Sequence, residues 1–213
     1  MKNIKGDKLM LSFVNNSETA VVIIHEIYGI NENIKLKCSD LFSQGYDVFC
    51  PNLLGSDYCY NYNQEEDAYV NFIQFVGIEK SVEQIQPILR ELRKKYKYLF
   101  IIGYSIGATI SWLCSVLGYC DGIVCFYGSR IRDFVSINVR CPIALYFAKS
   151  EKSFDVEELI VELRRKQNIE VINIYNGEHG FADQYSEKFN LESYLKSYKD
   201  MTKFIERIKS QNV

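Results

Sequence analysis

The 213-residue sequence predicts an α/β fold with a doubly wound, mainly parallel sheet flanked by helices. Three observations predict it. Apolar runs of strand length alternate along the chain with longer segments of helical period. Most of these runs are nearly continuous in Val, Ile, Leu and Phe, which is typical of strands that are covered on both faces. No repeat, low-complexity tract or Pro/Gly/Ser linker divides the chain, so we expect residues 1–213 to form one domain without a separate lid.

Seven apolar runs have the length and continuity of strands. In chain order the predicted strands span residues 9–14, 20–25, 47–50, 98–102, 122–127, 143–147 and 170–175. Because segments of helical period separate most of them, neighbouring strands are expected to run parallel. Sites in such sheets form beyond the carboxyl ends of the strands, so the residues that follow each strand are the candidates for function.

Six segments have the apolar period of a helix. They span residues 33–44, 65–76, 82–95, 108–117, 156–166 and 191–210. Ser81 and Asp155 each stand three residues before a Gln or Glu, a pattern that resembles a capping box at the start of the third and fifth helices. The basic residues that end helix 82–95 complement the carbonyl end of its dipole, and we interpret them as a solvated helix terminus.

Charge and cysteine content exclude several classes of function. The net charge of −2 and the pI near 5.8 provide no basic surface for a phosphate backbone, so a nucleic-acid partner is not expected. The 7 cysteines form no C-x-x-C pair and only 2 histidines accompany them, so no metal site is expected. An odd number of cysteines suits a reducing compartment. Residues 1–8 lack the apolar region of a signal peptide, and no run approaches the roughly 20 apolar residues that span a bilayer. We therefore expect a soluble, cytoplasmic protein without a membrane partner.

The segment Gly103-Tyr104-Ser105-Ile106-Gly107 lies between a predicted strand and a predicted helix. Strand, tight turn and helix form the context in which a G-x-S-x-G sequence becomes a nucleophile elbow. The two glycines allow the strand and the helix to approach closely, and the serine at the tip is held in a strained conformation. A serine in this position is typical of an acyl-transfer nucleophile, which indicates hydrolysis of an ester or a related acyl compound.

A serine nucleophile needs a base and an acid. His179 follows the last predicted strand and precedes the last predicted helix, which fits the chain order nucleophile, acid, base. His25 ends the second predicted strand, where we expect a structural role. Two carboxylates follow the strand 143–147, and either could hold the imidazole in the required tautomer. Glu151 is favoured because Asp155 has the separate task of capping the next helix.

Three segments resemble the dienelactone hydrolase family of the α/β-hydrolase superfamily. They are Val21 to Asn31, which contains the sequence HEIYGIN, Cys125 to Gly128, and Gly177 to Ala182. The resemblance covers nearly the whole chain in motif order. It implies an α/β-hydrolase-type sheet, and an oxyanion hole formed by the backbone N–H groups of Ile27 and Ile106. It implies neither a metal nor another cofactor.

The chain departs from the family pattern at three positions. Counted from Pro142, Glu151 stands where the family has an aspartate. The best-known members have a cysteine at the position of Ser105, and in them the glutamate that matches Glu26 contacts the nucleophile; here Glu26 is a possible auxiliary residue that orients water or supports the loop. Asp183 stands where dienelactone-cleaving members have an arginine that holds the substrate carboxylate, so dienelactone itself is not the expected substrate.

The expected function is that of a serine hydrolase that cleaves a small carboxylic ester or lactone through an acyl-enzyme intermediate. Ser105 attacks the carbonyl, His179 takes its proton and Glu151 supports the imidazolium. Two alternatives remain: a thioesterase or acyltransferase with the same residues, and a non-catalytic scaffold that binds a ligand or partner. Four tyrosines in one connection indicate a shallow aromatic pocket or a packing layer, namely Tyr58, Tyr60, Tyr62 and Tyr69. The sequence does not indicate the oligomeric state.

Overall fold

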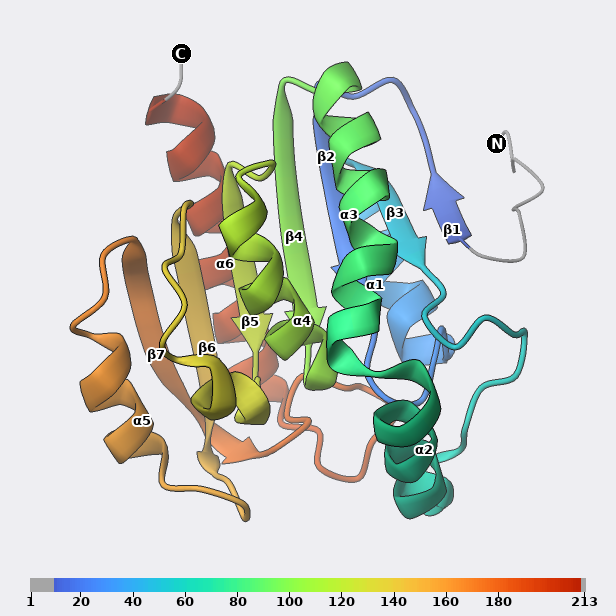
Figure 1. Cartoon of the computed structure of the whole chain (residues 1–213), viewed down its shortest axis with the longest axis vertical. Coiled ribbons are helices and arrows are strands. Elements are labelled where there is room, and N and C mark those ends of the chain that lie inside the picture. The colour runs from blue at the N-terminus through green and yellow to red at the C-terminus, as the bar shows by residue number, and fades with distance from the viewer. Residues whose placement is uncertain (1–9, 212–213) are drawn as a thin grey trace.

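The structure, a computed structural model, describes residues 10–211, which form a seven-stranded sheet between two layers of helices (Figure 1). The strands are β1 Met10–Phe13, β2 Thr19–Ile24, β3 Asp47–Pro51, β4 Tyr98–Tyr104, β5 Gly122–Phe126, β6 Ile143–Ser150 and β7 Ile169–Glu178. All seven predicted strands are confirmed. Leu9, the predicted first residue of the first strand, and the segment 1–8 lie outside the described residues.

The strand order is β1-β3-β2-β4-β5-β6-β7. The edge strand β1 pairs with β3 in the antiparallel sense, and every other pair is parallel. From β2 the chain moves outward to β3 and then returns to place β4 on the other side of β2. The order of the strands therefore reverses between β2 and β4, and their carboxyl ends diverge into the crevice where α/β sheets bind ligands.

Helices cover both faces of this sheet. They are α1 Glu32–Ser43, α2 Glu65–Asn71, α3 Ile78–Lys95, α4 Ile106–Cys114, α5 Val156–Leu163 and α6 Leu191–Gln211. In Figure 1, α3, α4 and α5 lie on the near face and α1 and α6 on the far face. The doubly wound, mainly parallel architecture predicted from the sequence is confirmed. None of the helices within residues 10–211 has the length and apolarity needed to cross a membrane.

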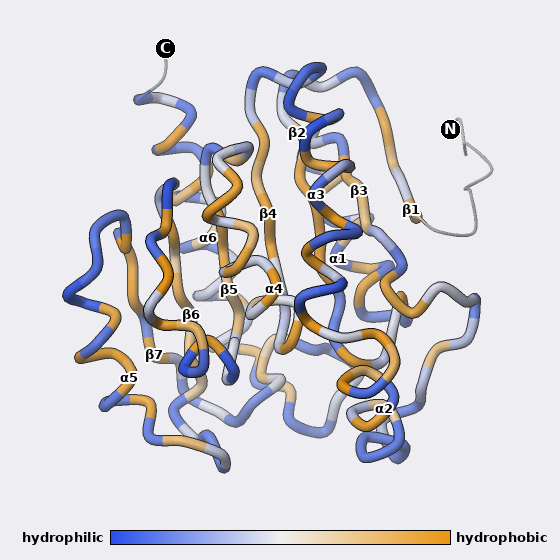
Figure 2. Tube along the Cα trace, in the orientation of Figure 1, coloured by the Kyte–Doolittle hydropathy of each residue, from blue (hydrophilic) through white to orange (hydrophobic). Residues whose placement is uncertain are grey.

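Strand β2 shows why the sequence specifies a covered sheet. Ala20, Val22 and Ile24 pack into the core under α3 and α4, whereas Val21 and Ile23 pack into the core under α1 and α6. All five side chains are fully buried. Since successive side chains of a strand point to opposite faces, a continuous apolar run is the pattern that fills both cores. Figure 2 shows the same continuity along β4, in contrast to the alternating polar and apolar turns of α3.

Several helix boundaries differ from the prediction. Helices α4 and α5 each end three residues early, at Cys114 and Leu163, and the differences at α3 and α2 have clear local causes. Helix α3 begins at Ile78 and not near residue 82, so the predicted cap Ser81 lies inside its first turns and its hydroxyl bonds to the Gly77 carbonyl. The predicted helix 65–76 is α-helical only as far as Asn71 and continues as a π-helical turn, Phe72–Val76. Gly77, with a φ of 79°, then separates this turn from α3. A glycine in this conformation ends one helix and allows the next to start at a new angle.

Candidate active site

The turn between β4 and α4 has the geometry of a strained elbow. Ser105 is its single residue and adopts a φ of 53° and a ψ of −117°. Residues other than glycine rarely adopt these backbone angles, and holding one there costs on the order of 1–3 kcal/mol of conformational energy. The Ser105 N–H donates to the Phe126 carbonyl of β5 at 3.0 Å, which anchors the turn to the neighbouring strand.

The two flanking glycines are required by close backbone approach. A Cβ on Gly103 would lie 2.2 Å from the Gly107 carbonyl oxygen, and a Cβ on Gly107 would lie 2.2 Å from the Ile24 carbonyl oxygen. Any side chain at these positions would therefore push α4 away from β4 and β2. The G-x-S-x-G spacing is thus explained by the packing of the helix onto two strands.

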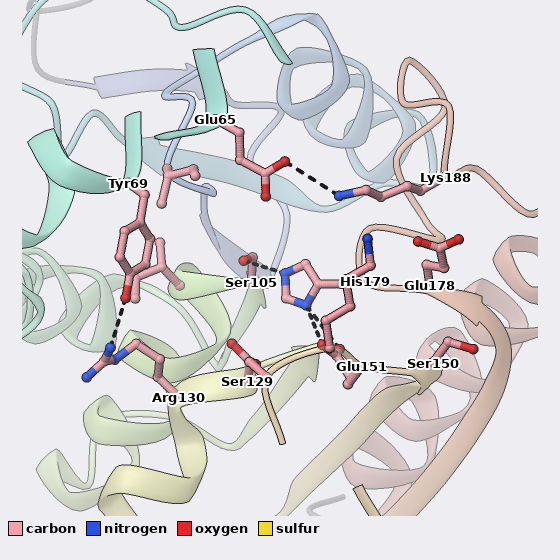
Figure 3. Close-up of a pocket in the computed structure, with 14 residues that line it drawn as sticks. Glu65, Tyr69, Ser105, Ser129, Arg130, Ser150, Glu151, Glu178, His179 and Lys188 are labelled. Carbon is pink, nitrogen blue, oxygen red and sulfur yellow. Dashed lines mark hydrogen bonds and ion pairs between the residues drawn. The ribbon is translucent and has the colours of Figure 1, made fainter. Parts of the chain in front are cut away.

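The Ser105 hydroxyl is hydrogen-bonded to one ring nitrogen of His179, and the Glu151 carboxylate contacts the other ring nitrogen (Figure 3). Ser105 Oγ lies 2.8 Å from His179 Nε2, and His179 Nδ1 lies 3.0 and 3.1 Å from the two oxygens of Glu151. A carboxylate accepts hydrogen bonds only, so Nδ1 carries the proton and Nε2 is left to accept the proton of the hydroxyl. Three residues that are far apart in the sequence therefore form one continuous hydrogen-bonded array.

Strand pairing brings the histidine and the glutamate together. Strands β6 and β7 pair as far as Ser150 and Glu178, so Glu151 and His179 are the residues that follow immediately on adjacent strands. The Glu151 side chain is only 2% exposed. Asp155 lies elsewhere, because its carboxylate accepts the N–H groups of Glu157 and Glu158 as the N-cap of α5. Of the two candidate acids, the structure brings Glu151 to the imidazole.

His25 holds the turn that follows β2. Its Nε2 accepts the Leu53 N–H at 3.0 Å, so the ring proton is on Nδ1, which donates to the Glu26 carbonyl at 2.6 Å. Burial lowers the pKa of this histidine to about 4, so the ring is neutral near pH 7. The ring fixes the backbone just before Ile27, the first of the two expected oxyanion donors.

The backbone N–H groups of Ile27 and Ile106 are both free to bind a ligand. Within residues 10–211, neither donates a hydrogen bond to another residue. Both residues line the same pocket as Ser105 and His179. An acyl oxygen placed between them would meet two unpaired donors, which is the arrangement that a developing oxyanion requires.

The pocket above Ser105 is small, with a volume of about 230 Å³. Its upper wall is formed by α2 and by the loop after His179, where Lys188 and Glu65 form an ion pair at 3.6 Å. Figure 3 shows a second contact at its left, where Arg130 donates to the hydroxyl of Tyr69, another residue of α2, at 3.0 Å. Of the four tyrosines predicted near this site, Tyr69 lines this pocket and Tyr62 a smaller cavity beside it, whereas Tyr58 and Tyr60 pack edge to face against each other.

Ser105 and His179 also line a second cavity of about 50 Å³ beside the pocket, here called the side chamber. Its polar lining includes Glu26, Tyr62 and Asp183. Asp183 accepts the Tyr62 hydroxyl at 2.7 Å and the Tyr185 N–H at 2.9 Å. Burial and the nearby Asp183 carboxylate raise the pKa of Glu26 from 4.5 to about 7.

Sequence reasoning missed Lys37, which supplies positive charge to this chamber. Its side chain is 1% exposed, its Nζ donates to the Ala182 carbonyl at 2.8 Å and it lies over the Tyr194 ring. The signal was present in α1, because Lys37 stands three residues after buried Ile34 and four before buried Leu41, on the face that must pack against the sheet. A lysine at such a position needs a buried partner. Within residues 10–211, no group of three or more His, Cys, Asp and Glu could hold a metal ion.

Comparisons with known proteins agree with this architecture. The family model described as the dienelactone hydrolase family matches residues 9–209. The protein YczH of Bacillus subtilis strain 168 is 40% identical over 178 residues, which is 83% of this chain and 87% of that protein. The carboxymethylenebutenolidase of Pseudomonas putida is 29% identical over 117 residues, 51% of this chain and 49% of that enzyme. A solved dienelactone hydrolase-like promiscuous phosphotriesterase, P91, from metagenomic libraries superimposes with a TM-score of 0.74 at 13% identity, covering 92% of this chain and 88% of P91.

Proposed function

The chain belongs to the dienelactone hydrolase family of α/β-fold hydrolases, and from that premise we propose that it is a serine hydrolase that cleaves a small carboxylic ester or lactone through an acyl-enzyme. The observation that carries the proposal is the array from Ser105 through His179 to Glu151 above a strained turn. A hydroxyl that already donates to an unprotonated imidazole nitrogen needs no rearrangement to become a nucleophile.

In the proposed first step, Ser105 Oγ attacks the acyl carbon while His179 Nε2 takes the hydroxyl proton. The new negative charge on the acyl oxygen faces the N–H groups of Ile27 and Ile106, and Glu151 stabilises the imidazolium. His179 then gives its proton to the departing alcohol oxygen, which leaves an ester on Ser105. Water hydrolyses this ester by the reverse sequence, and no metal or other cofactor takes part.

The size of the pocket and the buried carboxylate beside it support a small, neutral substrate. A volume of about 230 Å³ accommodates a small acyl compound and falls below the range of about 300–1,000 Å³ that is usual for drug-sized ligands. Buried Asp183 repels a carboxylate placed at the end of the histidine loop, so a neutral ester or lactone fits better than dienelactone. We assign catalysis to this one unit, without a separate lid domain.

The test combines active-site labelling with turnover. A fluorophosphonate probe should label the folded protein at Ser105, and short nitrophenyl esters should be hydrolysed. Ser105→Ala should abolish both labelling and hydrolysis, and His179→Ala should lower turnover by at least about 1,000-fold. Ser39→Ala, which removes an exposed hydroxyl on α1, is the matched control and should leave both unchanged.

The alternatives are outcomes of the same experiment. A folded protein that the probe does not label at Ser105 would favour a non-catalytic scaffold. Faster turnover of thioesters than of the matched oxygen esters would indicate a thioesterase, and transfer of the acyl group to an added alcohol in preference to water would indicate an acyltransferase. Wild-type turnover in either the Ser105→Ala or the His179→Ala variant would mean that the reaction occurs elsewhere.

A further inference from the structure

The side chamber has the size and lining of a water site. Its volume of about 50 Å³ exceeds the roughly 10–15 Å³ that a cavity needs to hold one water molecule, and it is too small for a substrate. Ser105 and His179 line it together with the side chains of Glu26, Tyr62 and Asp183. Its remaining polar lining is Tyr28, Glu65, Ser186 and Lys188. A buried water needs two to four polar partners, and the chamber offers them directly beside the groups that react.

Glu26 is a carboxyl of this lining with lone pairs left for a water. The residue is 4% exposed, and the side chain that lowers its pKa by hydrogen bonding is the buried Tyr127 hydroxyl. This contact is outside ordinary hydrogen-bond geometry, and within residues 10–211 the Tyr127 hydroxyl has no other partner. Buried polar groups without partners are rare in proteins, and an acceptor that lines a polar cavity is best satisfied by a water in that cavity.

Within residues 10–211, Glu26 makes no hydrogen bond to the Ser105 hydroxyl. The Ser105 hydroxyl donates to His179, so proton transfer during attack on the substrate needs no help from Glu26. The first half of the reaction therefore has its full set of groups without this carboxyl. The second half needs one further reactant, a water held near the acyl carbon and near His179 Nε2, and no residue named so far holds it.

We propose that the side chamber holds the water that hydrolyses the acyl-enzyme, and that Glu26 accepts a hydrogen bond from it and orients its oxygen toward the acyl carbon. This inference rests on the proposed function. The water oxygen forms the new bond to the acyl carbon and passes one proton to His179 Nε2, while its other hydrogen stays on the oxygen and is hydrogen-bonded to Glu26. The bond between the acyl carbon and Ser105 Oγ then breaks as His179 returns the proton to Oγ, which releases the acid and the free serine.

The charges around Glu26 govern how well it accepts such a bond. Two buried carboxyls, Glu26 and Asp183, share one buried ammonium group, Lys37. Asp183 raises the pKa of Glu26, whereas Lys37 and His179 lower it. Titratable groups from several elements face Glu26. The charged ones are Lys37 on α1 and His179 and Asp183 after β7. The tyrosines are Tyr104 at the end of β4, Tyr127 after β5, and Tyr28 and Tyr62 around the chamber. An ionised Glu26 is the stronger acceptor, so the second half-reaction should slow as pH falls through the pKa of this group.

The decisive experiment separates the two half-reactions with nitrophenyl acetate in a stopped-flow instrument. Glu26→Leu removes the acceptor and fills the chamber with an apolar side chain. We expect acylation within about 3-fold of wild type and deacylation slower by about 10- to 100-fold, because a misplaced reactant costs about that much. Intact mass spectrometry should then show an accumulated acetyl-enzyme that wild type lacks. Glu162→Gln, on the exposed face of α5, is the control for loss of a carboxylate.

A second arm does not depend on how well Glu26→Leu folds. Asp183→Asn removes the like charge and should move the acid limb of the deacylation rate to lower pH. The same substitution in a Glu26→Gln background should produce no shift. Equal slowing of both half-reactions by Glu26→Leu, or an equal Asp183→Asn shift with and without Glu26, would overturn the proposal. Failure of Ser105 to form any acyl-enzyme in the wild-type protein would instead overturn the proposed function.

Discussion

Glu26→Gln is predicted to stabilise the fold at alkaline pH, although it alters a buried residue beside the site. The pKa of Glu26 is raised in the folded protein from 4.5 to about 7, chiefly by burial and then by the Asp183 carboxylate. In the unfolded chain the group titrates near its ordinary value. As pH rises from 4.5 to 7, the unfolded state releases this proton first and is stabilised relative to the folded state, so the unfolding free energy of the wild-type protein falls over that interval.

The size of the effect follows from the shift. One pKa unit corresponds to about 1.4 kcal/mol, so the raised pKa of Glu26 costs about 3 kcal/mol of unfolding free energy at pH 8 and little at pH 4. Gln has nearly the same shape and no charge, so it removes this pH-dependent loss. For a chain of this length, 3 kcal/mol corresponds to roughly 6–12 °C in melting temperature.

Urea titration at several pH values measures this prediction. The chain has 1 tryptophan, Trp112, which is fully buried in α4 and reports unfolding by its fluorescence. The difference in unfolding free energy between Glu26→Gln and wild type should increase in favour of the variant by about 2–3 kcal/mol from pH 5 to pH 8. A difference that stays constant with pH would refute the reasoning, because it would mean that Glu26 titrates at the same pH in the folded and unfolded states.

Three further predictions concern the elbow, the acid and the first histidine. Gly107→Ala should lower the unfolding free energy by about 3 kcal/mol, because the new Cβ would meet the Ile24 carbonyl. Gly118→Ala is the control: it has open space around it and a φ of 72°, and should lower the unfolding free energy by about 1 kcal/mol. Equal losses in urea titration would contradict the steric argument. Glu151→Gln should lower kcat for nitrophenyl esters by about 100- to 10,000-fold, while Asp155→Asn should leave it near wild type; the reverse result would make Asp155 the acid. Burial lowers the pKa of His25 to about 4, so the folded protein binds this proton less readily than the unfolded chain does. The contribution of the neutral ring to the unfolding free energy is therefore complete above pH 6.5 and is lost as pH falls toward 4. His25→Gln should flatten the acid side of a plot of urea midpoint against pH.

The parts of the fold that local pattern specifies were predictable from the sequence. Continuous apolar runs gave all seven strands, and Asp155 caps α5 as its spacing indicated. Ser81 was misread because its helix starts at Ile78, before the apolar period becomes clear, and the hydroxyl that resembled a cap bonds backward to the Gly77 carbonyl. A side chain that can serve either as a cap or inside a first turn does not mark the boundary alone.

In the candidate site, too, the features set by local sequence were predictable and those set by tertiary contacts were not. Ser105 lies in a motif whose geometry follows from the two glycines beside it, so its strained conformation was foreseeable. The choice between Glu151 and Asp155 depended on where β6 ends, and the strand runs three residues beyond its apolar stretch because it stays paired with β7 as far as Ser150. The helical period of α1 indicates that Lys37 is buried, but it does not indicate the partner, the Ala182 carbonyl, which lies 145 positions away in the sequence.

The positions of Glu151 and His179 show why the extension of β6 matters for chemistry. If β6 ended at Phe147, Glu151 would lie in a loop, and its carboxylate could sample many positions relative to the imidazole. Because Ser150 is still paired with Glu178, both residues instead leave the sheet from adjacent, hydrogen-bonded strand ends. Their separation is then set by the spacing between strands, about 4.8 Å, and by two side chains with few rotatable bonds. A glutamate is longer than an aspartate by one methylene group, and a starting point fixed in this way lets both of its oxygens stay near 3 Å from Nδ1.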